Sequence, residues 1–526
     1  MKKILLLLTL SFSLISLQAQ DNLSALMPMP NQISNGPGVF KVSSALKVYT
    51  NATDLSMEQQ QLTRIMKQFF GTSVASGNSS STLHLLIDKS IKGNEHYVLK
   101  ITPHQLVIKG ASSAAVFYGL MTLEQLLTGD VCHTKKQEIQ AVTIDDMPRF
   151  GFRALMIDPA RNFLPLNDVK YYIDEIARYK YNTLQIHLTD NEGWRVEIKK
   201  YPQLTAKAPF YTQEELKELI AYAAQRHVEI LPELDIPGHT VALLASFPEL
   251  ACKQWRDSTF IPGVTNHRMV CASRPEVYDV YANILKEVAS IFPSPSIHLG
   301  GDEAALDNNW QNCDDCKALM KEKGYEKPAQ LMGYFFDKIL QTVRQVGKKP
   351  ILWVELDSVY PPFHSYLFKY PKDVTLVTWR LQNTPTCLDY TYKSGNPIIM
   401  APGEYAYLDY PQLKGDLPEF NNWGMPVLTL EQCYQFDPGY GLPKAEQAHI
   451  LGVMGTLWGE AMKNINRVTY MTFPRALALS EAGWTQMEHR SWNSFKQRLY
   501  PNLNVLMRRG VFVRVPYEIV DRKNFH

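Results

Sequence analysis

The segment HLGGDE (298–303) carries the most distinctive arrangement of chemical groups in the chain. Two glycines allow a sharp bend of the backbone, and the adjacent carboxylates of Asp302 and Glu303 follow them. Hydrolysis of a glycosidic bond commonly uses one carboxylic acid to protonate the leaving oxygen and a second carboxylate as nucleophile or base. Neighbouring side chains diverge near a strand, so this pair is poorly placed to flank one bond. We expect one carboxylate to be the acid and the other to position part of the substrate, the alternative being a solvated acidic turn.

Polar and aromatic side chains also follow the other buried apolar runs of the chain. They are Asp158, Arg161, Asp190, Asp235, His239, Trp353, Glu355, Trp379, Tyr407, Asp409, Trp458 and Glu460. Carboxylates accept hydrogen bonds from hydroxyl groups, and flat indole rings cover the C–H faces of a sugar. A metal site needs several ligands in close geometry, and His187 and His239 do not form a known spacing. These residue types predict a neutral carbohydrate ligand, with no metal and no cofactor.

The elements that must position these side chains are parallel strands. After Pro148 the sequence alternates between short apolar runs and amphipathic helical stretches. The predicted strands cover 153–157, 183–188, 229–234, 297–299, 351–354, 374–379, 397–400 and 453–458. Eight buried strands that alternate with helices are typical of a (β/α)8 TIM barrel, in which functional side chains gather at the carboxyl ends of the strands.

Helix signals support this alternation. Asn167 is the expected cap of one helix, and Thr212 with Glu215 forms a capping box for the next. A later helix should stop at Gly347. The connections over 236–275 and 401–450 are too long for simple turns, so we expect them to build part of the site.

The region before the barrel has a different pattern. Strand-like runs over 83–87, 97–101 and 106–108 precede a helical stretch over 112–127. We therefore predict a small α+β domain over 21–147, followed by the barrel domain over 148–526. A total of 526 residues with 45% hydrophobic and 20% charged side chains is typical of a folded globular chain and excludes a disordered one.

The first twenty residues are typical of a secretory signal peptide. Lys2 and Lys3 precede an apolar run over 4–17 that is too short to span a bilayer, and Ala19 offers a small residue for cleavage. A short N-terminal anchor helix is the alternative. We expect export to a periplasmic, secreted or surface-associated location, with no membrane span. The 54 basic and 52 acidic residues nearly balance, which gives no electrostatic case for nucleic acid.

Seven cysteines in an exported chain leave at least one unpaired within the chain. Cys252 and Cys271 flank a polar loop, so a disulfide that closes this loop is plausible. Cys313 and Cys316 form a CxxC pair. With no second pair or nearby His at zinc spacing, we favour a local disulfide or plain thiols over zinc.

The chain resembles the β-N-acetylhexosaminidases of glycoside hydrolase family 20 over nearly its whole mature length. The segments that carry the resemblance are MPRF (147–150), DPARNF (158–163), HLTDNEGWR (187–195), PELDIPGH (232–239), HLGGDE (298–303), the Trp353 segment, YLDY (407–410) and LWGE (457–460). HLGGDE and PELDIPGH together are highly specific. The resemblance implies a non-catalytic α+β domain, a catalytic barrel, and an oligosaccharide or glycoconjugate substrate that ends in β-linked N-acetylhexosamine.

The resemblance also implies an exo-acting, retaining and substrate-assisted mechanism. Glu303 would be the general acid and then the base that activates water. Asp302 would orient the 2-acetamido group, whose carbonyl oxygen attacks the anomeric carbon to give an oxazolinium intermediate, and Tyr407 would donate a hydrogen bond to that oxygen. The other implied roles are walls for the sugar and its acetamido group (Trp353, Trp379 and Trp458), ligands for the hydroxyls (Arg161, Asp409 and Glu460), and support for Glu303 (Asp190 and His239).

Some alternatives stay open at this point. Within the same fold the enzyme could release a disaccharide such as lacto-N-biose, and a degenerate barrel could bind glycans without catalysis. Trp379 could belong to the barrel core, and His239 could merely satisfy local backbone groups. The chain departs from the family's common residues at Asn162 (often His), at Asn191 and Glu192 (often Asp-Gln), and at Val354 (often acidic or amide).

Overall fold

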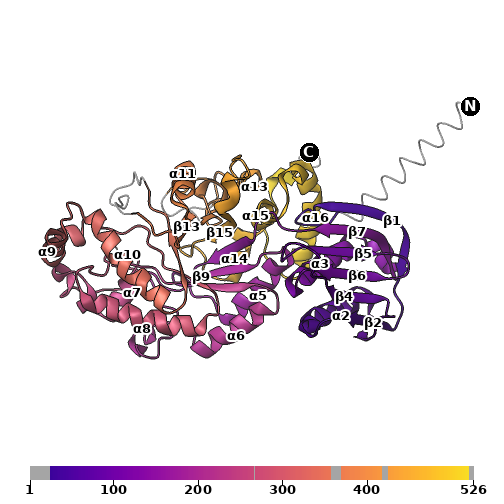
Figure 1. Cartoon of the computed structure of the whole chain (residues 1–526), viewed down its shortest axis with the longest axis horizontal. Coiled ribbons are helices and arrows are strands. Elements are labelled where there is room, and N and C mark those ends of the chain that lie inside the picture. Colours follow the sequence, from indigo (N-terminus) through magenta and orange to yellow (C-terminus); the bar gives the residue numbers. More distant parts are fainter. Residues whose placement is uncertain (1–23, 266, 357–368, 417–423, 520–526) are drawn as a thin grey trace, which may run out of the picture.

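The protein consists of a small sheet domain and a larger barrel domain that lie side by side (Figure 1). The computed structural model describes residues 24–265, 267–356, 369–416 and 424–519. The predicted fold class, a (β/α)8 barrel preceded by an α+β domain, is confirmed.

The N-terminal domain is built on one mixed sheet. Its strands are β1 (Gln32–Lys41), β2 (Leu46–Thr50), β3 (Val74–Ser76), β4 (Leu83–Ile87), β5 (Tyr97–Ile101), β6 (Leu106–Gly110) and β7 (Glu138–Asp146), in the order β1-β7-β5-β6-β4-β2-β3. In β5 the side chains of Tyr97, Leu99 and Ile101 are buried and alternate with more exposed ones, the period of two that a strand imposes. Helices α2 (Ser56–Phe70) and α3 (Ser113–Gly129) pack together beside the sheet, and α3 is buried over most of its length.

Eight parallel strands close the barrel. They are β8 (Phe152–Ile157), β9 (Thr183–His187), β10 (Glu229–Glu233), β11 (Ser296–His298), β12 (Lys349–Trp353), β13 (Thr375–Thr378), β14 (Ile398–Met400) and β15 (Ile450–Leu457), in the closed order β10-β11-β12-β13-β14-β15-β8-β9. Each coincides with a predicted strand. Most of their side chains are buried, as expected of parallel strands covered on the outside by helices.

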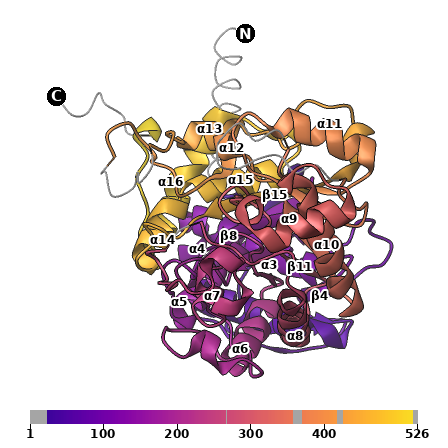
Figure 2. The ribbon, with the colours of Figure 1, turned by 90° about the vertical axis from the view of Figure 1, so that its left-hand side faces the viewer.

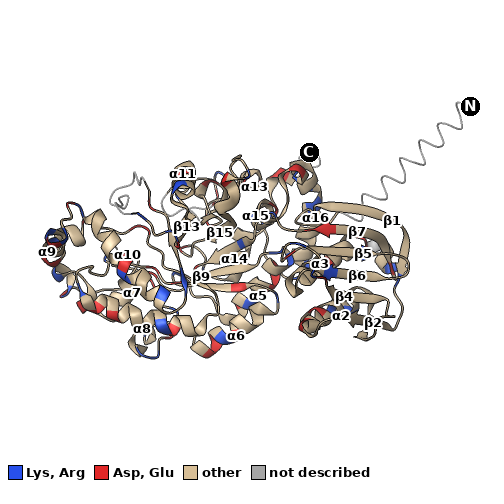
Figure 3. Ribbon diagram, viewed as in Figure 1, with Lys and Arg blue, Asp and Glu red and all other residues tan. Residues whose placement is uncertain are grey.

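Helices surround the barrel (Figure 2). The longer ones are α5 (Leu166–Arg178), α6 (Gln213–Ala224), α8 (Pro275–Ile291), α9 (Asp314–Lys323), α10 (Pro328–Gln345), α11 (Thr384–Ser394), α14 (Ile465–Thr472), α15 (Arg475–Trp484) and α16 (Trp492–Arg508). Acidic and basic residues are interspersed along these helices (Figure 3), in keeping with the balanced charge of the chain.

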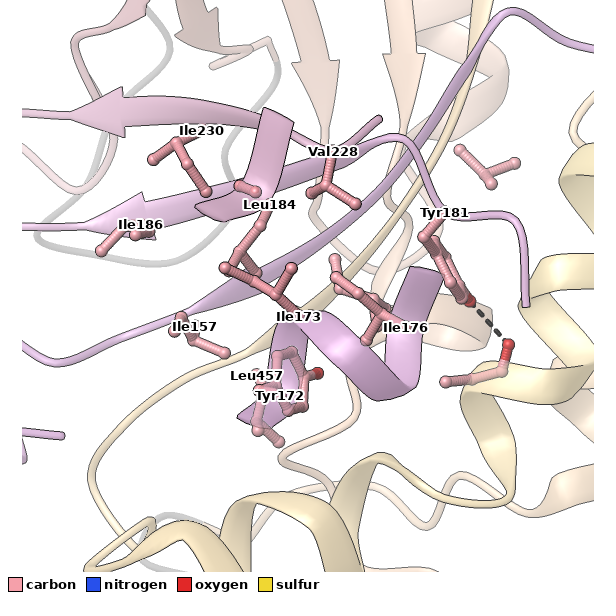
Figure 4. Close-up of a cluster of buried hydrophobic side chains, with 14 of the residues drawn as sticks. Ile157, Tyr172, Ile173, Ile176, Tyr181, Leu184, Ile186, Val228, Ile230 and Leu457 are labelled. Carbon is pink, nitrogen blue, oxygen red and sulfur yellow. Dashed lines mark hydrogen bonds between the residues drawn. The ribbon is translucent and has the colours of Figure 1, made fainter. Parts of the chain in front are cut away.

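Helix α5 illustrates how the helices attach. Its apolar stripe, Tyr172, Ile173 and Ile176, packs against Ile157 of β8 and Leu184 of β9 (Figure 4). The apolar residues of such a stripe recur every three or four positions. The stripe therefore faces the barrel along the whole helix.

Three helix boundaries were predicted from residues that cap or end helices. The capping box of Thr212 and Glu215 at the start of α6 is confirmed. Gly347 follows the end of α10 with a φ of +77°, the left-handed conformation that terminates helices. The prediction for Asn167 is wrong: α5 begins at Leu166 with Pro165 as its cap, because the fixed φ of a proline suits the start of a helix.

Buried charges join the two domains. Asp146, at the end of β7, accepts hydrogen bonds from Lys180 Nζ (3.0 Å), Tyr97 Oη (2.7 Å) and Trp484 Nε1 (3.0 Å). Burial lowers the pKa of Lys180, and the charge of Asp146 opposes that shift. Trp484 is fully buried at this junction.

The cysteines are arranged differently from the prediction. Cys252 and Cys271 are not joined to each other, and Cys313 and Cys316 are also free. An antiparallel bridge between Ala251 and Val270 brings the first pair together, and the start of α9 brings the second pair to the same place. The four thiols therefore form one buried cluster. Cys252 and Cys271 are the second cysteine pair beside the CxxC pair, and the sequence alone did not reveal that they lie there.

Among the described residues no helix is long and apolar enough to cross a membrane.

Candidate active site

A pocket of about 410 Å³ opens at the carboxyl ends of the barrel strands. Its described lining is Arg161, His239, Asp302, Glu303, Trp379, Arg380, Leu381, Tyr407, Asp409, Tyr410, Met425, Trp458 and Glu460. Nine of the eleven predicted site residues are in this set. The other two, Asp190 and Trp353, are buried behind the lining, where Asp190 contacts His239 and Trp353 contacts Trp458.

The turn after β11 shapes the base of the pocket. Gly300 has a φ of +62°, and a Cβ there would lie 1.8 Å from Asp235 Oδ1. The N–H of Gly301 donates to the same oxygen at 3.2 Å. Glu303 itself has a φ of +47°, a conformation that costs energy for a residue with a side chain. The two glycines therefore let the chain pass Asp235 closely and turn Asp302 and Glu303 into the pocket.

Asp302 and Glu303 share one imidazole neighbour. His239 Nε2 lies 3.8 Å from Asp302 Oδ2 and 3.7 Å from Glu303 Oε2. Burial raises the pKa of Glu303, His239 opposes the rise, and the charge of Asp302 adds to it. A carboxyl group with a raised pKa keeps its proton at higher pH, which is what a general acid needs.

A chain of buried groups fixes His239. Its Nδ1 lies 3.1 Å from Asp190 Oδ1, and Asp190 Oδ2 lies 2.7 Å from His187 Nε2. Burial alone would lower the pKa of His239, but Asp190, Asp235 and Asp302 together raise it well above its ordinary value. Asp190 therefore faces one ring nitrogen of His239, and the other ring nitrogen faces Glu303.

The same network of buried side chains continues beneath the pocket through Glu233. Its Oε2 lies 2.9 Å from His187 Nδ1, and its Oε1 lies 3.1 Å from His298 Nδ1 and accepts a hydrogen bond from Trp353 Nε1 at 2.9 Å. Burial alone would raise the pKa of Glu233, but the two histidines hold it well below its usual range. The indole of Trp353 lies behind Trp458, at 5.8 Å between ring centroids.

Arg161 binds the same carboxylate, Asp190, and joins it to two further acidic residues. Its guanidinium lies 2.7 Å from Asp158 Oδ2, 3.0 Å from Asp190 Oδ2 and 3.6 Å from Glu460 Oε1. It also lies over the ring of Trp458, at 5.1 Å from the centroid. These contacts fix both the guanidinium and the indole before a ligand arrives.

Four buried polar atoms of the pocket lining have no hydrogen-bond partner among the described residues. They are His239 Nε2, Asp302 Oδ1, Tyr407 Oη and Asp409 Oδ1. Burial raises the pKa of Tyr407 and of Asp409 well above their ordinary values, with Tyr410 and Glu460 adding to the respective shifts. A buried polar atom without a partner costs about 1–3 kcal/mol, so the site is built to receive hydrogen bonds from a ligand.

The geometry agrees with comparisons to known proteins. The model of "Glycosyl hydrolase family 20, catalytic domain" matches residues 150–487, and that of "Glycosyl hydrolase family 20, domain 2" matches residues 23–147. The chain belongs to glycoside hydrolase family 20.

Relatives and solved structures of this family match most of the chain. A β-hexosaminidase of Akkermansia muciniphila is 36% identical over 450 residues, which are 82% of this chain and 88% of that one. The structure of an exo-β-N-acetylglucosaminidase of Vibrio harveyi in complex with N-acetylglucosamine has a TM-score of 0.80 at 28% identity, covering 94% of this chain and 79% of that one. A β-N-acetylhexosaminidase of Bacteroides fragilis has a TM-score of 0.80 at 26% identity, covering 93% and 97%. The chain is a β-hexosaminidase that releases terminal N-acetylhexosamine.

Trp379 and Trp353 occupy different layers of the site. Trp379 lines the pocket, and its Nε1 donates to the carbonyl oxygen of Val354 at 3.2 Å, which fixes the ring. Trp353 is 1% exposed and packs in the barrel interior. Trp379 is therefore placed to contact a sugar directly, and Trp353 supports Trp458 from behind.

Arg380 is a pocket residue that was not predicted from the sequence. This residue lines the pocket and binds Glu355 through two hydrogen bonds of 2.9 and 2.8 Å, and Glu355 Oε1 accepts the N–H of Glu303 at 3.2 Å. Burial raises the pKa of Glu355 to about 7 against the opposing charge of Arg380. The signal was present, because Arg380 directly follows Trp379 at the end of β13.

Two departures from the family's common residues lie at the rim. Asn162 Nδ2 donates to the carbonyl oxygen of Gly459 at 2.6 Å. This hydrogen bond joins the loop after β8 to the loop after β15. Glu192 Oε2 lies 3.8 Å from Arg161 Nε, and burial, with the nearby charge of Asp190, raises its pKa to about 7.

Two groups in the site have ligand atoms within 4.8 Å of one another, as a metal would require. They are His187 with Asp190 and Asp235, and Asp235 with His239 and Asp302. Both nitrogens of His187 and Nδ1 of His239 already face carboxylates at 2.7 to 3.1 Å. The arrangement therefore suits a network that holds protons and positions Glu303.

Proposed function

We propose that the enzyme removes single terminal β-linked N-acetylhexosamine residues by a retaining, substrate-assisted mechanism. The observation that carries this proposal is that two buried atoms of one pocket, Asp302 Oδ1 and Tyr407 Oη, have no hydrogen-bond partner in the described part of the chain. A carboxylate oxygen accepts and a phenol donates, so together they complement the N–H and the C=O of an acetamido group.

The reaction then follows in two steps. Glu303 gives its proton to the glycosidic oxygen while the acetamido carbonyl oxygen forms a bond to the anomeric carbon, and the bond between that carbon and the leaving oxygen breaks. Asp302 stabilises the positive charge that develops on the acetamido nitrogen, and Tyr407 holds the attacking oxygen. Glu303, now ionised, takes a proton from a water molecule, which opens the cyclic oxazolinium from the other face and restores the original configuration.

The remaining lining fits the terminal sugar itself. Asp409 Oδ1 is a buried acceptor without a described partner, the charge of Glu460 acts on Asp409, and Glu460 Oε1 lies 3.6 Å from Arg161 Nε. Trp379 and Trp458 offer flat apolar surfaces for the C–H faces of the ring. We assign Arg161, Asp409 and Glu460 to the hydroxyls of a non-reducing end, which makes the enzyme exo-acting.

Two aryl substrates that differ only at carbon 2 test this function. We expect rapid release from an aryl 2-acetamido-2-deoxy-β-glucoside and almost none from the matching β-glucoside, which has no internal nucleophile. Equal rates would refute substrate assistance. The Asp302→Asn variant keeps the side-chain volume but removes the charge, and we expect kcat on the acetamido substrate to fall by about 10²-fold or more.

Defined oligosaccharides distinguish the other two functions. An exo-acting enzyme should release only monosaccharide, whereas release of an intact disaccharide would instead assign it to the lacto-N-biosidase type. Binding of a glycan without any turnover would assign it to a non-catalytic barrel. The wild-type protein should show turnover and monosaccharide product.

We also infer that the protein is exported. The basic, apolar and small-residue order of the first twenty residues supports this proposal. Mass measurement of the protein from its native host should give a chain shortened by about 20 residues. A full-length cytoplasmic chain would contradict export.

A further inference from the structure

We propose that Cys252, Cys271, Cys313 and Cys316 bind one zinc ion that has a structural role. The four Sγ atoms lie within 4.8 Å of one another, and all four side chains are 0% exposed. Tetrahedral coordination by four thiolates is characteristic of structural zinc sites.

The distances inside the cluster suit a shared ion. Zinc–sulfur bonds of about 2.3 Å at tetrahedral angles place the sulfurs about 3.8 Å apart. Cys271 Sγ lies 3.5 Å from Cys316 Sγ and 3.9 Å from Cys313 Sγ. Cys271 therefore has two sulfur neighbours at nearly this separation, and all four cysteines are free thiols in the structure.

The cluster joins two loops that both carry active-site residues. Cys252 and Cys271 belong to the connection after β10, which also holds His239. Cys313 and Cys316 lie in the connection after β11 and the first turn of α9, downstream of Asp302 and Glu303. An ion bound to all four thiolates would fix the separation of these loops.

Hydrogen bonds beside the cluster also run from one loop to the other. Trp310 Nε1 donates to the carbonyl oxygen of Val270 at 2.9 Å, and Asn309 Nδ2 donates to that of His267 at 2.9 Å. Gln254 Nε2 donates to the carbonyl oxygen of Asn309, also at 2.9 Å. The loops are therefore held together around the cluster, as a structural site requires.

Groups next to the thiols suit a negatively charged zinc centre. Ser273 Oγ lies 3.1 Å from Cys271 Sγ and 3.6 Å from Cys316 Sγ, where its hydroxyl can support the ligands. Cys316 lies in the first turn of the ten-residue helix α9, whose N-terminal N–H groups favour negative charge. Four ligands leave no position for a substrate or water, so the role is structural and separate from catalysis.

Metal analysis combined with a thiol count tests the proposal. The full chain, purified without added metal or reductant, should contain one zinc per chain and show seven free thiols after denaturation in chelator, since the sequence has seven cysteines. Less than stoichiometric zinc would overturn the proposal. So would another metal in its place, or a count of five or three thiols, which indicates one or two disulfides.

Matched variants identify the ligands. Cys316→Ser should lose the zinc and unfold at lower temperature, whereas Cys433→Ser, which changes another fully buried cysteine, in α13 (Leu430–Gln435), should keep one zinc. Cobalt-substituted wild-type protein should show the visible absorption of tetrahedral cobalt thiolate. Retention of zinc by Cys316→Ser would overturn the assignment. If that variant fails to fold, the metal content and thiol count of the wild-type chain still decide the question.

Discussion

Replacement of Glu303 by glutamine should affect substrates according to how much help their leaving group needs. Glutamine keeps the size of the side chain but cannot give a proton to the glycosidic oxygen. A natural oligosaccharide leaves as a sugar alkoxide and needs that proton, whereas a dinitrophenolate leaves without it. The first step should therefore slow greatly for the oligosaccharide and little for the activated aryl glycoside.

The magnitude follows from the position of Glu303. Its carboxyl lies in the pocket with a pKa raised by burial, so it is a well-matched proton donor. General acid catalysis by a placed carboxyl group contributes about 10²–10⁴-fold. This corresponds to about 3–5 kcal/mol of transition-state stabilisation. We expect kcat/KM for chitobiose to fall by that factor in Glu303→Gln, and kcat/KM for the dinitrophenyl substrate to fall by less than about 10-fold.

The pH profile gives an independent measurement of the same group. Activity of the wild-type enzyme on the oligosaccharide should fall as the pH rises through the raised pKa of Glu303, because the acid is then ionised. In Glu303→Gln the residual activity on the oligosaccharide should lose this alkaline limb, and the wild-type enzyme should show little of it on the dinitrophenyl substrate. Stopped assays across pH, with circular dichroism as the control for folding, measure both effects. An equal loss on both substrates, or an unchanged alkaline limb, would remove Glu303 from the acid role.

Three further predictions follow from the fold and the site. Gly300→Ala should lose activity, because the new Cβ would clash with Asp235. The left-handed backbone alone should lower the stability of this variant by about 1–2 kcal/mol. The control Gly151→Ala has open space around its Cβ and should leave the thermal melt unchanged. Lys180→Met leaves Asp146 buried without its cation and should lower the free energy of unfolding by about 3–5 kcal/mol. A decrease below about 1 kcal/mol would refute the role of this pair at the domain junction. A thiazoline that mimics the cyclic intermediate should bind far more tightly than the product sugar, and inhibition only at millimolar concentration would count against the cyclic intermediate.

The barrel was predictable because its strands are encoded locally. Each of the eight predicted runs is buried and rich in apolar residues, and each coincides with a strand. The strand ends also indicated the pocket, since a parallel barrel brings all its carboxyl ends to one face. Nine predicted side chains consequently line one cavity.

The features that were missed depend on contacts between distant segments. The prediction for Cys252 and Cys271 considered them as a local pair, but their other neighbours, Cys313 and Cys316, are more than 40 residues further along the chain. The support that Arg380 gives Glu355 depends on the neighbouring placement of β12 and β13, which residue types alone do not define. The burial of Trp353 likewise depends on which face of β12 points into the barrel. The sequence of this strand alone did not determine that face.

Successive fluorination of the substrate's acetamido methyl group tests the central claim most directly. Fluorine withdraws electrons from the carbonyl oxygen while adding little bulk, so it weakens that oxygen as a nucleophile and leaves recognition by Asp302 and Tyr407 largely intact. If this oxygen attacks the anomeric carbon, kcat for aryl substrates should fall steadily from the acetyl to the trifluoroacetyl derivative. A rate that does not change along the series would contradict substrate-assisted catalysis at this site.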